Sequence, residues 1–306
     1  MENITPKLDR ELLVAELTAD RFIKVTNFGK NEIYIVNHLN SPHVMQEIGR
    51  LREIAFREAG GGTGKSLDID SYDLGHNPFE QLIVWDPDNR EIVGGYRFIR
   101  MKNLEIDASG QVKTPTSRLF NLSQKFINEY LPITIELGRS FVQPDYQPSK
   151  NPRLGLFSLD NLWDGLGAII KNNPDVEYFF GKITMYPDSD LLAREAIMYF
   201  LNRFFPDPDR LVYPHNPLEI KTDRLVFQEI FIHDTYADNY KTLQQLVRKQ
   251  NETIPPLVNA YMNLSPTMKT FGTSINPTFG DVEETGIMIR IADIYNEKKA
   301  RHIEGV

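Results

Sequence analysis

The spacing of apolar side chains along the first hundred residues changes from that of strands to that of a helix and back. Residues 21–37 hold short runs of Ile, Val, Phe and Tyr around a glycine, which predict one or two strands. Ser41 and Pro42 form a helix-start signal, and the apolar residues behind them recur at spacings of four, three and four. An amphipathic helix is therefore predicted up to the glycines at 60–62.

Strand patterns return in the next part of the chain. The apolar runs 79–86 and 91–100 flank a Pro-Asp-Asn sequence and predict a β-hairpin. A short helix is predicted near 123–130, and a strand over 133–142 follows behind Pro132.

Helix and strand patterns then alternate. Apolar residues recur at helical spacing in 156–170 and 191–205, and the continuous apolar run 176–185 between them is typical of a buried strand. Beyond residue 205 the patterns are weaker. They predict a strand near 224–231, a helix near 240–250 and a strand over 284–294.

The order of these elements predicts an α/β or α+β fold, in which a sheet carries a cover of helices. No internal repeat or low-complexity linker interrupts the chain. We therefore expect a single domain over 1–306, with 206–306 as an extension of the same domain.

Composition narrows the classes of function. The net charge is −8 and the basic residues are scattered, whereas a nucleic-acid-binding protein clusters Lys and Arg on one face. The absence of cysteine excludes thiolate catalysis and fits a reducing compartment, and the six histidines show no metal-ligand spacing. No apolar run approaches the roughly 20 residues of a membrane span, and no signal-peptide pattern opens the sequence. We expect a cytoplasmic protein without metal, nucleic acid or transmembrane helix.

The most conspicuous short motif is AGGGTGKS at 59–66, which is similar to a phosphate-binding loop with Ala in place of the first glycine. Such a loop holds phosphates when a strand leads in and a helix follows. Here a predicted helix leads in, and LDIDSYD follows with no helical pattern. We expect a flexible Gly-rich loop instead, whose functional form would be a mobile lid over a cleft.

An acidic cluster, Asp68, Asp70 and Asp73, comes directly behind this loop. It has three interpretations: a calcium-like loop, a site for a cationic substrate, or a solvated turn. The calcium interpretation lacks the glycine and the distal glutamate that such loops have in register.

The predicted strand ITIELGRSFV carries a charge on its apolar face. Strict alternation places Arg139 beside Leu137 and Phe141, where a buried charge needs a partner. A β-bulge at Gly138 would instead turn Arg139 onto the polar face with Glu136. We favour the bulge. A carboxylate and a guanidinium joined in this way could serve acid/base chemistry or substrate orientation. A structural ion pair is the alternative.

Taken in order, several segments resemble the GNAT-type acyltransferases. These include the ornithine and glycine N-acyltransferases of bacterial amino-lipid synthesis, some of which carry a haemolysin label, and the resemblance extends more distantly to the acyl-homoserine-lactone synthases. The segments are LREIAF (51–56), DIDSYD (68–73), GGYRFI (94–99), ELGRSFVQPDY (136–146), and LWDGL with YFFGKITM. The resemblance spans roughly residues 20–205 well and the tail loosely.

The resemblance implies a fold and a set of site residues. The fold would be a mixed, twisted sheet with helices on both faces, whose central strands splay apart to admit a pantetheine arm. Glu136 would act as the catalytic base or orient it, and Arg139, Arg52 and Arg97 would bind the acceptor carboxylate or organise the acidic loop. Asp70 and Asp73 would pair with an arginine or with the acceptor ammonium. The cleft for the acyl chain and pantetheine would be lined by Phe56, Trp85, Ser140, Phe141 and Val142.

The implied reaction moves a long-chain, 3-hydroxy acyl group from acyl carrier protein to the amine of a small amino acid. No cofactor would bind tightly, since the acyl thioester, on carrier protein or coenzyme A, is the co-substrate. Residues 152–159 lack the full Gly-rich pattern that cradles coenzyme A, which favours the carrier protein. Glycine and ornithine both fit as acceptor, and glycine is favoured because no cluster recognises a second ammonium.

Three questions stay open on the sequence alone. The protein could contact the inner face of the cytoplasmic membrane peripherally. It could be a coenzyme A-dependent, short-chain N-acetyltransferase. It could also be a non-catalytic protein that binds a lipid or an acyl carrier protein in the same cleft.

Overall fold

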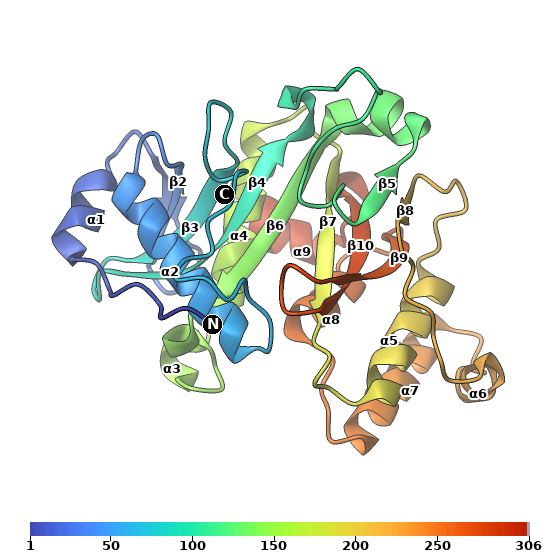
Figure 1. The fold of residues 1–306 in the computed structure, drawn as a ribbon. Coiled ribbons are helices and arrows are strands. Elements are labelled where there is room, and N and C mark those ends of the chain that lie inside the picture. Colours follow the sequence, from blue (N-terminus) through green and yellow to red (C-terminus); the bar gives the residue numbers. More distant parts are fainter. Residues whose placement is uncertain (305–306) are drawn as a thin grey trace. The chain divides into compact units, whose positions relative to one another are not determined.

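The computed structural model describes residues 1–304 as helices, strands and loops (Figure 1). Its chain divides into two compact units. Unit 1 holds Met1–Asn103, Ile133–Glu177 and the chain from Tyr295 onward, and unit 2 holds Leu104–Pro132 and Tyr178–Ile294. The expected single domain over 1–306 stays a prediction. In residues 1–304 no helix combines the length and the apolar character that crossing a bilayer requires.

The sheet of unit 1 is antiparallel, with its strands in the order β1-β2-β3-β4-β6. Its strands are β1 (Phe22–Val25), β2 (Glu32–Val36), β3 (Glu80–Asp86), β4 (Glu91–Arg100) and β6 (Thr134–Val142). The predicted strands around 21–37, the hairpin and the strand over 133–142 are therefore confirmed.

Helices cover both faces of this sheet. The unit contains α1 (Arg10–Glu16), α2 (Pro42–Glu58), α3 (Pro152–Gly155), α4 (Ser158–Asn172) and α9 (Asn296–Lys299). Arg52 of α2 donates a hydrogen bond to Gln81, whereas a Cβ on Gly165 of α4 would lie 2.6 Å from Leu82. Since neighbouring residues of a strand point to opposite faces, α2 and α4 lie on opposite sides of β3 (Figure 1).

The start of α2 differs in one detail from its prediction. Ser41 is the N-cap residue and Pro42 follows it, but the Ser41 side chain makes no cap hydrogen bond. Glu16, at the end of α1, accepts from the backbone N–H of His43 at 3.1 Å and of Val44 at 2.9 Å instead. A carboxylate from another helix thus satisfies the free N–H groups and the positive end of the helix dipole.

Unit 2 combines a small sheet, a ribbon and a group of helices. The sheet is antiparallel in the order β7-β10-β9, with β7 (Tyr178–Met185), β10 (Val282–Arg290) and β9 (Lys269–Asn276), and the ribbon pairs β5 (Phe120–Leu122) with β8 (Val212–Pro214). The helices are α5 (Leu191–Phe204), α6 (Arg224–Ile230), α7 (Tyr236–Lys249) and α8 (Pro256–Met262).

The fold class is α/β, as predicted, while one predicted strand is wrong. Residues 224–231 form the helix α6, because Asp223 caps it by accepting from Leu225 N at 2.9 Å, and Phe227 and Phe231 are buried four residues apart. The mixed character of the sheet and the splay of its central strands depend on β6 and β7. These strands belong to different units, so both features stay predictions.

Candidate active site

The predicted site residues come mainly from α2, the acidic loop, β4 and β6, all within unit 1. On α2, the Arg52 guanidinium is fully buried. Its Nη1 lies 3.2 Å from Asp73 Oδ1 and its Nη2 donates to Gln81 Oε1, while Gln81 Nε2 donates to Asp73 Oδ1 at 3.1 Å. Arg52, Asp73 and Gln81 therefore form a closed, buried network.

Arg97 joins this network from β4. Its Nη1 lies 2.8 Å from Asp70 Oδ1 and 3.1 Å from Asp73 Oδ2. Its guanidinium carbon stands 5.4 Å from the centre of the Phe79 ring and 5.8 Å from that of Tyr72, within cation–π range. A buried guanidinium is costly to desolvate, and here the carboxylates and the aromatic rings offset that cost.

The acidic loop is shaped by hydrogen bonds within itself. Asp70 Oδ1 accepts from Tyr72 N at 2.8 Å, and Asp73 Oδ2 accepts from Asp70 N at 3.1 Å. Burial would raise the pKa of Asp73, but the charges of Arg52 and Arg97 outweigh burial and hold that pKa far below its ordinary value. Burial likewise opposes the charge of Arg97, yet Asp73 and Asp70 raise its pKa. The loop is thus an ionised partner of the arginines rather than a solvated turn.

Arg139 enters from the predicted bulge in β6. Strand β6 pairs Gly138 with Arg97 and Phe141 with Gly95, so two residues of β6 stand opposite Tyr96 of β4. Arg139 itself has φ +49°, a left-handed conformation that non-glycine residues adopt rarely. The β-bulge predicted at Gly138 is present one residue further on, at Arg139 and Ser140.

The bulge brings Arg139 to the acidic loop. Its Nε lies 2.8 Å from Asp68 Oδ2, its Nη2 lies 4.0 Å from Asp70 Oδ2, and its guanidinium carbon stands 6.0 Å from the centre of the Phe56 ring. Glu136, three residues earlier on β6, is 1% exposed and pairs in register with Ile99. The chain therefore gathers Arg52, Arg97 and Arg139 around Asp68, Asp70 and Asp73, with Phe56 beside Arg139.

The remaining predicted residues are placed less closely. Phe141 is buried in β6, and Ser140 and Val142 are half-buried on the same strand. Trp85 is buried near the far end of β3, four residues from Gln81 and so about 13 Å along the strand. The structure does not bring Trp85 to the arginine cluster.

Two members of the cluster were missed as site residues in the sequence. Asp68 is fully buried and binds Arg139, and Gln81 bridges Arg52 and Asp73. Asp68 begins the alternating aspartates of LDIDSYD, and Gln81 is a polar residue in a largely apolar run. Both signals were visible, but only tertiary packing shows that these side chains are partners.

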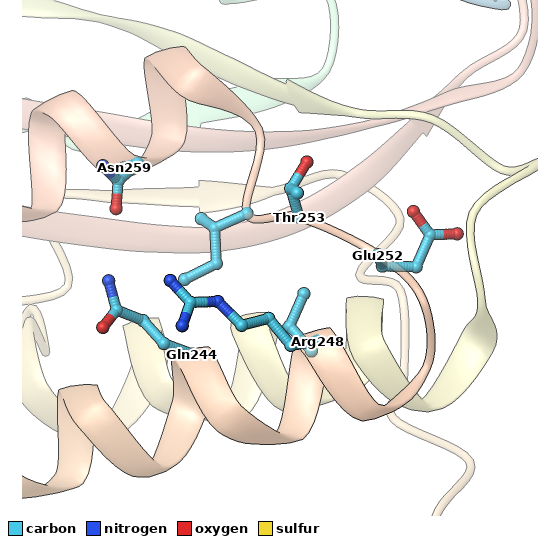
Figure 2. A pocket seen from close by; sticks show the side chains of 7 residues that line it. Gln244, Arg248, Glu252, Thr253 and Asn259 are labelled. Atoms are coloured by element: carbon cyan, nitrogen blue, oxygen red, sulfur yellow. The ribbon is translucent and has the colours of Figure 1, made fainter.

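The cavities described in the structure lie elsewhere. One of about 160 Å³ lies in unit 2, between α7, the loop behind it and α8, and is lined by Gln244, Val247, Arg248, Glu252, Thr253, Ile254 and Asn259 (Figure 2). Another of about 200 Å³ lies between β1 and the end of α4. Neither contains a predicted site residue. In the described part of the chain, no group of three or more His, Asp or Glu side chains is arranged to hold a metal ion.

Comparison with known proteins gives matches over the whole chain. A family model described as an acetyltransferase (GNAT) domain matches residues 51–156, which include the arginine–aspartate cluster. A glycine N(alpha)-acyltransferase of Phocaeicola vulgatus is 53% identical over 304 residues, which cover 99% of this chain and 93% of that protein. One of Bacteroides thetaiotaomicron is also 53% identical, over 99% of this chain and 90% of its own length.

Solved structures give weaker matches. The coenzyme A-dependent acyl-homoserine lactone synthase BjaI, with SAM and isopentyl-CoA, is 18% identical with a TM-score of 0.33, over 51% of this chain and 67% of its own. The acyl-homoserine-lactone synthase LasI is 15% identical with a TM-score of 0.29, over 50% and 71%. At these values the likeness does not establish a shared reaction.

Proposed function

This chain belongs to the glycine N(alpha)-acyltransferase family of GNAT-type enzymes, and we propose that it transfers a long-chain acyl group from a pantetheine thioester to the amine of glycine. The family resemblance carried by its sequence segments is confirmed by the full-length relatives. As a member of this family the chain is an acyltransferase, which removes the non-catalytic alternative.

One observation supports the assignment of an amino acid as acceptor. Within the cluster, the side chains of Arg139 and Asp70 are 15% and 22% exposed, whereas those of Arg52, Asp68 and Asp73 are at most 1% exposed and that of Arg97 is 2%. The two accessible groups have opposite charges and lie 4.0 Å apart. A zwitterion can bridge such a loose pair, with its carboxylate on Arg139 and its ammonium on Asp70.

The buried members of the cluster then have a supporting role in this proposal. Arg52 is paired with Asp73, and Arg97 with both Asp73 and Asp70, so these arginines hold the acidic loop in place rather than touch the acceptor. The family resemblance implied either role for Arg52 and Arg97. Their ion pairs favour the organising role, because both guanidinium groups are already bound by aspartates of the acidic loop.

The proposed chemistry requires a base and an oxyanion site. Glu136 accepts a proton from the acceptor ammonium, directly or through a water, and the free amine attacks the thioester carbonyl carbon. A C–N bond forms, the tetrahedral oxyanion collapses, the C–S bond breaks, and the pantetheine thiol leaves with a proton. Because a bulge takes a residue out of the strand ladder, we assign the backbone N–H that stabilises the oxyanion to the segment at Arg139 and Ser140.

The donor is proposed to be a 3-hydroxyacyl group on acyl carrier protein, which would place the reaction in amino-lipid synthesis. Phe56, Ser140, Phe141 and Val142 are proposed to line the acyl cleft, and Trp85 to lie at its distant end. We place the enzyme in the cytoplasm, with peripheral contact to the membrane that receives its product. A coenzyme A-dependent acetyltransferase is the second candidate, favoured by the name of the matching domain model.

The test compares donors at a fixed acceptor. Purified protein is incubated with glycine and either a 3-hydroxyacyl carrier protein, the same acyl group on coenzyme A, or acetyl-coenzyme A, and the products are identified by mass spectrometry. The proposal expects N-acylglycine from the carrier-protein donor. N-acetylglycine alone would support the second candidate, and no acylated glycine from any of the three donors would contradict the proposal.

A further inference from the structure

The Gly-rich loop at 59–66 has an anion of the protein's own where a phosphate-binding loop would hold phosphate. Glu53 of α2 is fully buried, and its Oε2 accepts from Thr63 N at 3.0 Å and from Thr63 Oγ1 at 2.7 Å. Its Oε1 accepts from Gly64 N at 2.8 Å and lies 2.6 Å from Arg57 Nε. The loop is therefore filled from within and needs no external ligand.

The surroundings of the Glu53 carboxylate favour its ionised form. Burial would raise the pKa of Glu53, but the hydrogen bonds from Thr63 and the Arg57 guanidinium outweigh burial and lower it. Gly62 makes the approach possible, because it has φ +93° and a Cβ there would lie 3.3 Å from Glu53 Oε1. The loop is fixed by a buried ion, in contrast to the flexible loop that its glycines predict.

The first residues of the chain hold the loop from its other side. Glu2 N donates to Gly64 O at 2.8 Å, and Ser66 N donates to Glu2 Oε2 at 2.9 Å. Thr5 N donates to Ser66 O at 3.1 Å, and Arg57 Nη1 donates to Glu2 O at 2.8 Å. Arg57 thus links the Glu53 carboxylate to residues 2–5.

The fixed loop leads directly into the acceptor site. Two residues behind Ser66, Asp68 N donates to Gly49 O of α2 at 3.0 Å, and the buried Asp68 carboxylate binds Arg139 Nε at 2.8 Å. Gly49 packs closely against the residue after Asp68, since a Cβ at Gly49 would lie 2.6 Å from the Ile69 side chain. The loop is therefore linked to Asp68 by a short, closely packed segment, and through Asp68 to Arg139.

We propose that Glu53 is a positioning residue of the acceptor site: it fixes the Gly-rich loop 59–66, which places Asp68 and so sets the guanidinium of Arg139. This inference rests on the proposed function, in which Arg139 binds the carboxylate of glycine. In Glu53→Gln, an amide NH₂ would face N–H donors and Arg57, so the loop would shift while the thioester cleft stays unchanged.

The test measures both Michaelis constants and kcat for Glu53→Gln. We expect the KM for glycine to rise by about tenfold, the effect of a small misplacement of a binding group, while the KM for the acyl donor stays unchanged. Glu53→Asp, which keeps the charge, should give a value between wild type and Glu53→Gln. The matched control is Glu58→Gln, on the same helix but exposed and paired with Lys150, which should change neither constant.

Two further measurements separate this inference from a purely structural role and from the proposed function. If Glu53→Gln does not fold, Thr63→Ala keeps the carboxylate and removes the Oγ1 bond, and it should raise the KM for glycine by a smaller factor. Amide hydrogen exchange should become faster over 60–73 in either variant, whether or not the wild type acylates glycine. Unchanged exchange, or an unchanged KM for glycine with only a lower kcat, would overturn the inference. An inactive wild type would contradict only the proposed function.

Discussion

Arg139 has a strained backbone. Among the arginines of the cluster in the described structure, its side chain is also the one that is clearly exposed to solvent. Its left-handed conformation costs of order 1–3 kcal/mol, and the ion pair with Asp68 holds it there. Such strain is kept when the surrounding contacts determine it, and it is common at active sites. In our account the bulge presents Arg139 to the acceptor.

Arg139→Lys tests that role. Lysine keeps the positive charge but loses the planar fork that binds a carboxylate through two N–H groups. We expect the KM for glycine to rise by about tenfold, with a smaller change in kcat, in steady-state assays. An unchanged KM for glycine would place the acceptor carboxylate elsewhere.

Glu136→Gln tests the proposed base. The amide has the same shape and cannot accept the ammonium proton, so kcat should fall by about 10²–10⁴-fold while the thermal midpoint and the KM for glycine change little. The readout is kcat at saturating substrates, with a thermal melt as the folding control. Full turnover by this variant would remove Glu136 from the mechanism.

Gly138→Ala tests whether the space beside the bulge is used. A Cβ at Gly138 would meet no atom within 4 Å, so we expect unchanged thermal stability. If the reacting groups pass through that space, turnover should fall by about tenfold. Gly49→Ala is the contrasting control, because its Cβ would lie 2.6 Å from Ile69 and should lower the thermal midpoint. Wild-type turnover of Gly138→Ala would mean that the space is not part of the reaction path.

At the scale of elements, the acidic loop joins α2 to β4 through buried charges. The lowered pKa of Asp73 means that its ionised form stabilises the fold at pH above its ordinary, unfolded value near 4, and that this contribution is lost as pH falls. Asp73→Asn leaves Arg52 and Arg97 underpaired. We expect the free energy of unfolding to fall by about 3–5 kcal/mol at neutral pH.

The pH dependence of the stability lost in Asp73→Asn tests this explanation. Urea unfolding at pH 7 and at about pH 3 should show a larger difference between wild type and Asp73→Asn at pH 7, because protonation of Asp73 in the unfolded chain reduces the wild type's advantage in acid. An equal difference at both pH values would show that the charge of Asp73 does not stabilise these elements.

The elements differ in how far the sequence predicts them. The helix α2, the hairpin β3–β4 and strand β6 are predicted because their apolar periodicity is long and turn or cap residues bound them. The helix α6 was predicted as a strand, since its β-favouring Val and Phe outweighed the Asp223 cap and the four-residue spacing of Phe227 and Phe231. Strand β9 was missed because Gly272, with φ +81°, interrupts its pattern.

The contacts within the candidate site could be predicted from the sequence only in part. A bulge near Gly138 could be predicted, because an arginine on an apolar face must turn or find a partner. The pairing of Arg139 with Asp68, and the internal carboxylate of Glu53, could not be predicted, because both join residues that only folding brings together.

At the scale of the whole molecule, the net charge of −8 affects the binding of the two proposed substrates differently. An acidic enzyme repels an acidic carrier protein at long range, so the proposed donor must be recognised through local contacts. The acceptor, in contrast, is small and zwitterionic, and in our proposal it is bound by the local pair of Arg139 and Asp70.

The most direct test of the central claim is a competition among acceptors. Wild-type protein, a long-chain acyl donor and equal concentrations of glycine, alanine, serine and ornithine are combined, and the N-acyl products are quantified by mass spectrometry. Our account predicts that N-acylglycine is the main product, and that it is lost in Glu136→Gln. N-acylornithine as the main product, or no N-acyl amino acid at all, would contradict it.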